Sequence, residues 1–146
     1  MTGVHIAIGV GMVAVNLAAA LLGGWQWWRG TPGTLFWPLL RAGQALTVLA
    51  AADGLILVIA GDDLPELHLV YGLTPIGVSF LAEQLRLAAA DTVLAARDLE
   101  NAQAMRGLPE SEQHAIVHQI VRRELGVMAA SAFVVAVLGL RAGAWL

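Results

Sequence analysis

The chain has 146 residues, of which 58% are hydrophobic and only 13% are charged, with a net charge of -3. Soluble globular domains carry about 45–50% apolar and about 25% charged residues, so this composition excludes a soluble domain, a disordered chain and a coiled coil. The absence of cysteine excludes disulfides, thiolate metal sites and thiol catalysis. The negative net charge argues against nucleic acid as a partner, because phosphate binding requires a basic surface.

Four apolar runs of helical length follow one another along the chain. A hydrocarbon core of about 30 Å requires about 20 residues in an α-helix. The runs extend from about Val4 to Gly24, Leu35 to Ala60, Leu67 to Arg86, and Leu125 to Gly143. The first run has no Lys or Arg before it and is longer than the apolar part of a secretory signal, so we expect it to remain in the mature chain. The pattern predicts an all-α, integral membrane four-helix bundle that forms a single domain over residues 1–146.

The cations, all of them arginines, are distributed unevenly between the connecting segments. Arg29 lies between the first two runs and residues 86–123 hold most of the others, whereas residues 61–66 hold acids and no cation. By the positive-inside rule the arginine-bearing segments face the cytoplasm, and both termini lie outside. The tryptophans fit this orientation at two predicted interfaces, Trp25, Trp27, Trp28 and Trp37 inside and Trp145 outside. Arginine in place of lysine and abundant alanine are typical of a GC-rich bacterial genome, so we expect a multi-pass protein of the bacterial plasma (inner) membrane.

Residues 90–124 form the only sizeable polar segment, and their pattern is helical. The third run continues as a helical overhang up to a break at residues 107–109, with apolar positions Leu94, Leu99 and Ala102. A second helix begins with Glu110 and Glu112 in its first turn, where the helix dipole favours acids, and continues into the fourth run. We expect a cytoplasmic helical hairpin that docks on the membrane or on a partner.

The third run begins with a pattern similar to that of the first. His5, Gly9, Val15 and Asn16 align with His68, Gly72, Val78 and Ser79. A tandem two-helix repeat would produce this alignment, and so would chance between two apolar, low-complexity helices. Both explanations remain open at this point.

Polar and small residues gather on one face of each of these two runs. At about 100° per residue, one stripe consists of His5, Gly9, Met12, Asn16, Ala20 and Gly23. The other consists of His68, Tyr71, Gly72, Pro75, Ser79, Glu83 and Arg86. Polar groups in hydrocarbon face protein or a water-filled cavity, so both stripes should point into the bundle. Their small residues allow a neighbouring backbone or a flat ligand to approach closely.

Two polar sites are expected inside the predicted spans. Arg41, on one face with Gln44 and Val48, lies at a depth similar to that of Glu83 near the inner surface, so the two can pair. The alternative is that Arg41 reaches the headgroups and Glu83 bonds the arginine one turn later. Asp53 lies near the outer surface, where it must be protonated, pair with Arg141 or line a polar cavity.

The first candidate binding site is formed by His5 and His68. Both lie at the outer ends of spans that run in the same direction, and each has a glycine one turn below it, Gly9 and Gly72; Tyr71 lies beside them. Two neutral imidazoles on facing helices, with room for a flat macrocycle, hold haem b by bis-histidine ligation. In this general sense the pattern resembles membrane haem bundles.

Three alternatives concern the histidines. A copper ion could take His5, Met12 and His68 as ligands, because imidazole and thioether suit copper. Alternatively, His5 and His68 are hydrogen-bonding residues near the acids of residues 61–66. His114 and His118 are four apart on a helix, which suits a zinc or copper site and equally suits a solvated helix surface.

No serine nucleophile motif, phosphate loop or zinc-protease motif is present, although Asp53, Tyr71 and Glu83 could do acid–base work in a cavity. The function predicted first is an accessory or scaffold component of a membrane complex, with the lipid bilayer and either a membrane protein or a second copy of the chain as partners. The alternative is a bundle that binds haem b or another redox ligand through His5 and His68. Four spans without a charged ring do not favour a channel or transporter formed by one chain.

Overall fold

The computed structural model describes residues 3–144, and all their regular structure is helical. The helices are α1 (Gly3–Arg29), α2 (Phe36–Ile59), α3 (Glu66–Ala95), the short 3-10 helix η1 (Ala102–Gly107) and α4 (Glu110–Gly143). The predicted all-α class is therefore confirmed, and no strand occurs between residues 3 and 144. Trp145, which the sequence placed at the outer interface, lies outside the described residues.

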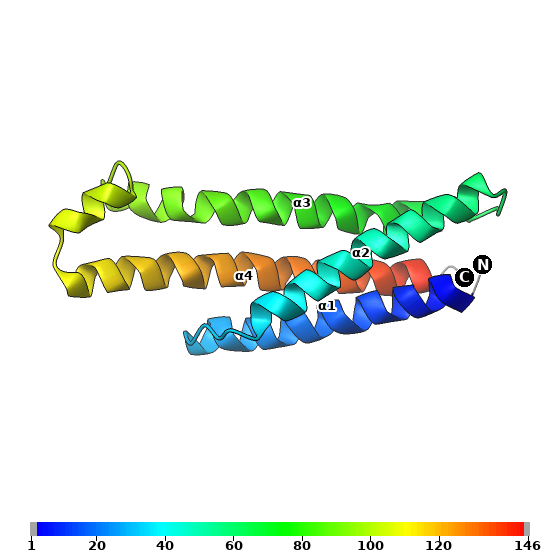
Figure 1. Ribbon diagram of the computed structural model, residues 1–146, viewed down its shortest axis with the longest axis horizontal. Coiled ribbons are helices and arrows are strands. Elements are labelled where there is room, and N and C mark those ends of the chain that lie inside the picture. Colours follow the sequence, from blue (N-terminus) through cyan, green and yellow to red (C-terminus); the bar gives the residue numbers. More distant parts are fainter. Residues whose placement is uncertain (1–2, 145–146) are drawn as a thin grey trace.

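The four long helices run up and down, so that each is antiparallel to the next (Figure 1). Helix α4 packs extensively on both α3 and α1, and α2 packs on α1 but meets α3 and α4 only sparsely. In Figure 1, α2 crosses obliquely in front of α1. The two helix pairs are thus not packed as equivalent halves, and the tandem repeat stays a prediction.

Helix α1 buries the face that its periodicity indicates. Its buried residues are His5, Met12, Asn16, Ala19, Ala20 and Gly23, and only Gly9 of the predicted stripe is half-buried. On α3 the predicted stripe is also turned inward, with His68 and Pro75 buried and the remainder half-buried. Both stripes therefore point into the bundle.

Helix α2 buries a different face from the one that the sequence indicated. Its buried residues are Phe36, Leu40, Gly43 and Thr47, whereas Arg41 and Val48 are exposed. Apolar side chains surround this helix on all sides, so its sequence offers little contrast between faces. Two residues of the buried face, Phe36 and Leu40, belong to the main hydrophobic core of the bundle.

The main core lies where all four helices approach one another. It contains Phe36 and Leu40 of α2, Leu125 and Met128 of α4, and alanines of α1, α3 and α4. A Cβ atom on Gly23 would come within 2.4 Å of the Phe36 ring, so this glycine allows the ring to fit against α1. We call the end of the bundle near this core, where α1 finishes, the arginine end.

A buried polar contact joins α1 to α2 near the middle of the bundle. The side-chain amide of Asn16, 1% exposed, donates to the carbonyl oxygens of Met12 at 2.9 Å and Gly43 at 3.1 Å. It also lies 3.4 Å from Oγ1 of Thr47. A Cβ atom on Gly43 would come within 2.9 Å of the Asn16 side chain, so the glycine is what allows the two helices to cross closely here.

Helices α3 and α4 continue past the ends of α1 and α2 as a hairpin, drawn green to yellow in Figure 1. We call residues 90–117 the overhanging hairpin. The predicted start of the second helix at Glu110 is confirmed, but α3 ends at Ala95 rather than extending to residue 107. Asp98 has a φ of 56° there, and the chain turns so that Leu99 packs against the buried residues Val93, Leu94 and Ile116.

Three helices, α1, α2 and α4, are long and apolar enough to cross a membrane. Helix α3 is not among them, because it carries polar side chains along its inner face. Its outer face is nevertheless apolar, with exposed Leu73, Ile76, Phe80, Leu81 and Leu85. The composition of these helices is that of a membrane protein, as the sequence predicted.

Candidate functional site

His5 of α1 and His68 of α3 come together at the end of the bundle opposite the arginine end, which we call the histidine end. Their ring centroids lie 5.8 Å apart, and the ring planes are tilted by 54°. Both side chains are buried, with 8% and 7% of their surface exposed. The structure therefore brings together the two histidines that the sequence singled out.

One nitrogen of each histidine is held by a partner from another helix. Nδ1 of His5 lies 2.9 Å from Oδ2 of Asp53 on α2. Nδ1 of His68 lies 3.2 Å from the carbonyl oxygen of Ala142 on α4, and a carbonyl can only accept, so this nitrogen carries the proton. The proton on Nδ1 makes Nε2 of His68 an acceptor, which is the form in which a neutral imidazole binds a metal.

The partner of Asp53 corrects the sequence-based alternatives. Its carboxylate pairs with His5, whereas Arg141 places its guanidinium carbon 6.0 Å from the centroid of the Tyr71 ring. Helical position alone gave the depth of Asp53 in the bundle but not the neighbour that it faces. His5 is consequently flanked by a carboxylate on one side and by the second imidazole on the other.

A cavity of about 700 Å³ lies beside the two imidazoles and is lined by all four helices. Its walls are almost entirely apolar, and His5, Gly9, Gly54, His68 and Gly72 are among the residues that line it. A Cβ atom on Gly9 or Gly72 would meet nothing within 4 Å, so these two glycines face open space. A Cβ atom on Gly54 would lie 3.2 Å from Cε1 of His5, so this glycine makes room for the imidazole.

Two other residues that the sequence placed at this site differ in position. Met12 lines the cavity, and its methyl group occupies the space that a Cβ atom of Gly139 would require. Tyr71 is half-buried beneath Arg141 and is not among the residues that line the cavity. The cavity is therefore lined by the thioether of Met12 but not by the phenol of Tyr71.

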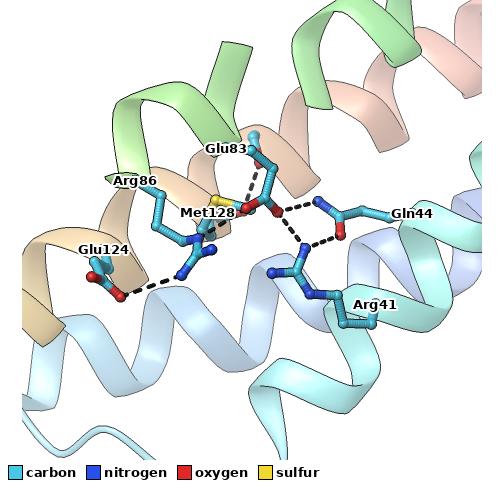
Figure 2. Close-up of polar contacts among 7 residues, drawn as sticks. Arg41, Gln44, Glu83, Arg86, Glu124 and Met128 are labelled. Carbon is cyan, nitrogen blue, oxygen red and sulfur yellow. Dashed lines mark hydrogen bonds and ion pairs between the residues drawn. The ribbon is translucent and has the colours of Figure 1, made fainter. Parts of the chain in front are cut away.

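A second polar cluster joins α2, α3 and α4 closer to the arginine end (Figure 2). The Glu83 carboxylate accepts hydrogen bonds from Arg41, from Nε2 of Gln44 at 3.0 Å and from Nε of Arg86 at 2.9 Å. Arg86 also reaches Glu124 of α4 at 3.8 Å. The expected pair between Arg41 and Glu83 therefore forms, Glu83 also bonds Arg86 one turn later, and Glu124 was missed. With its four charges balanced and Glu83 surrounded by donors, the cluster ties three helices together.

The two histidines of α4, both exposed, differ in their contacts. His118 places Nε2 2.8 Å from the carbonyl oxygen of Gly30, which joins α4 to the end of α1. His114 is exposed on the overhanging hairpin. Within residues 3–144, no group of three or more His, Asp or Glu side chains is placed to hold a metal ion, so a metal at His114 and His118 stays a prediction.

The histidine end places two buried imidazoles beside an apolar cavity. Comparison of the chain with models of known protein families, with curated proteins and with solved structures found no match. The geometry of the histidine end is accordingly the main guide to function.

Proposed function

We propose that this chain is a four-span protein of the bacterial plasma membrane that holds haem b between His5 and His68. The observation that carries the proposal is the convergence of two buried imidazoles, each anchored through Nδ1, beside an apolar cavity. Bound haem would supply a one-electron iron couple.

The membrane part of the proposal rests on the outer surface of the bundle. Exposed large apolar side chains occur on all four long helices, including α3, for example Val10, Ile56, Phe80 and Phe133. Such a surface is stable in contact with lipid and costly in water. The acidic loop at residues 61–66 and the arginines at the opposite end support an orientation with both termini outside.

The distance between the two imidazoles and the volume of the cavity support haem as the ligand. A linear imidazole–metal–imidazole unit with metal–nitrogen bonds of about 2.0–2.1 Å places the two ring centroids about 6–6.5 Å apart. The observed separation of 5.8 Å is close to this range. The cavity of about 700 Å³ is within the range of sites for cofactors and other small molecules, about 300–1,000 Å³.

The test is the absorption spectrum of the protein purified in mild detergent from cells supplied with haem precursor. We expect a Soret band that shifts on reduction with dithionite, and its loss in His68→Ala. His114→Ala is the matched control, because His114 is exposed and remote from the cavity. A colourless wild-type protein that also fails to bind added haemin would refute the haem, and copper found by metal analysis would support the alternative with Met12.

Blocking the cavity provides a second test that leaves both histidines in place. In Gly72→Leu the new side chain would extend into the open space beside the site. We expect this variant to fold but to lose haem. If it folds and binds haem as the wild type does, the ligand does not occupy this cavity.

A second role is supported by the overhanging hairpin. We propose that it docks on another membrane protein, because it projects beyond α1 and α2 as a folded unit with its own buried residues, Val93, Leu94 and Ile116. Gentle solubilisation followed by mass spectrometry should recover a stoichiometric partner, which is lost when exposed Val117 is changed to Glu. Recovery of a lone monomer from native membranes would count against this role.

A further inference from the structure

Three tryptophans and three arginines of α1 and α4 gather at the arginine end. We call them the tryptophan–arginine collar, which consists of Trp25, Trp27, Trp28, Arg29, Arg122 and Arg123. The tryptophan rings are between 44% and 68% exposed, although indole is among the largest apolar surfaces that a side chain can bury. The collar lies where the apolar part of α1 ends, so it marks a boundary between apolar and polar surroundings.

The collar is ordered by contacts between α1 and α4. The guanidinium carbon of Arg29 lies 5.2 Å from the Trp25 ring centroid, and that of Arg122 lies 5.5 Å from the Trp27 ring centroid. Nε of Arg122 also donates to the carbonyl oxygen of Trp27 at 3.2 Å. Gly126 allows this contact, because a Cβ atom there would lie 2.7 Å from the Trp27 ring nitrogen.

The three arginines of the collar have no carboxylate partner in the described part of the chain, where Glu83 and Glu124 pair with other arginines. A guanidinium that stacks beside an aromatic ring keeps most of its own N–H groups directed outward. Arg29 and Arg122, with Arg123 exposed beside them, can therefore bind anions from outside the chain. The opposite end differs, because its loop carries Asp62, Asp63 and Glu66.

We propose that the collar binds the headgroups of anionic phospholipids. Arginine donates two hydrogen bonds at once to a phosphate, and indole rings prefer the level of the headgroups, so both residue types suit the same molecule. The acyl chains would lie along the exposed apolar side chains of α1 and α4, such as Leu21 and Phe133. This role does not depend on the ligand of the histidine end.

The test compares phosphatidylglycerol with phosphatidylcholine of the same acyl chains, each added to the delipidated protein in detergent. We expect phosphatidylglycerol to raise the melting temperature by several degrees and to remain bound in native mass spectra, and phosphatidylcholine to do neither. The variant Arg29→Gln/Arg122→Gln/Arg123→Gln should lose more than half of this response. The single variant Arg29→Gln should lose part of it, and because Arg29 is exposed this change leaves the core intact.

The matched control is Arg97→Gln/Arg106→Gln, which removes arginines from the overhanging hairpin outside the collar. It should keep the full response. Equal responses to the two lipids, a full response in the triple variant, or a control that loses as much as the triple variant would each overturn the proposal. A shift of the same size with inorganic phosphate alone would also overturn it, because it would show a soluble anion site rather than a lipid site.

Discussion

Two pairs of glycines, one pair at each end of the bundle, have opposite surroundings. At the arginine end, a Cβ atom on Gly23 would overlap the Phe36 ring, and one on Gly126 would overlap the Trp27 ring. At the histidine end, a Cβ atom on Gly9 or Gly72 would meet nothing within 4 Å. The first pair allows close packing, and the second pair borders an open space.

The polar groups show the same contrast. The side-chain amide nitrogen of Asn16 is surrounded by three hydrogen-bond acceptors from α1 and α2, and this contact is structural. His5 and His68 bond Asp53 and the carbonyl oxygen of Ala142 through Nδ1, and their rings border a cavity. We therefore expect the packed half to contribute most of the stability of the bundle and the proposed ligand to bind in the open half.

The largest effect should come from Gly23→Val, because core side-chain atoms of Phe36 and Ala129 surround this position. Overpacking of this kind costs about 3 kcal/mol of unfolding free energy. Gly72→Val is the matched control, since its side chain enters open space, and it should cost less than about 1 kcal/mol. Denaturation by SDS, followed by tryptophan fluorescence, measures both. Equal losses of unfolding free energy in the two variants would contradict the contrast between the two ends of the bundle.

A smaller loss is expected for Asn16→Leu, which keeps the volume of the side chain but removes its bonds to Met12 and to α2. Hydrogen bonds between membrane helices contribute about 1–2 kcal/mol at most. Thr47→Val removes the longest of the Asn16 contacts and the bond from Thr47 to the carbonyl oxygen of Gly43 on its own helix, but keeps the two shorter Asn16 bonds, so it should cost less than Asn16→Leu. If Asn16→Leu is neutral, the polar contact does not stabilise the helix crossing and the packing of Gly43 alone explains it.

The Arg41–Glu83 pair should contribute less again, because 49% of the Arg41 side chain is exposed. A double-mutant cycle with Arg41→Gln and Glu83→Gln should give a coupling energy of about 0.5–1 kcal/mol. The same cycle with Arg41→Gln and Glu112→Gln, on the overhanging hairpin, should give none. Coupling in the second cycle would mean that the first reports a general effect of charge.

The smallest effect on stability is expected for Gly54→Ala. Its Cβ atom would lie 3.2 Å from His5, so the imidazole must move by a few tenths of an ångström, while alanine favours the helix by up to about 1 kcal/mol. The unfolding free energy should stay nearly constant and the affinity for haemin should fall several-fold. Gly9→Ala, which meets no neighbour, should change neither. Unchanged haemin affinity in Gly54→Ala would show that the position of His5 is not critical.

Periodicity was sufficient to predict the inner faces of α1 and α3, since polar and small residues mark one stripe on each. It also predicted that His5 and His68 would lie at the same end, because both helices run in the same direction. It failed for α2, where Phe36 and Leu40 are buried but resemble the apolar residues on every other side. The end of α3 at Ala95 was missed because the turn depends on contacts between Leu99 and residues of α4.

The partners of the site required the tertiary structure. The depth of Asp53 could be estimated from its position along α2, but the crossing angle of α2 against α1 decides that it faces His5. The partner of His68 is a backbone carbonyl, that of Ala142, which no residue type in the sequence reveals. For Glu124, position on α4 gave no indication because the helix is polar on several sides at that level.

Helix α4 is unbroken over 34 residues, which is about 50 Å at 1.5 Å per residue. It begins in the overhanging hairpin, passes the core at Met128 and ends beside Ala142, whose carbonyl oxygen bonds His68. If the packed core acts as a pivot, a tilt of about 3° moves Ala142 by about 1 Å over the intervening 21 Å or so of helix. Helix α4 is then a lever, and a force applied to the hairpin would change the spacing of the two histidines at the opposite end of the bundle.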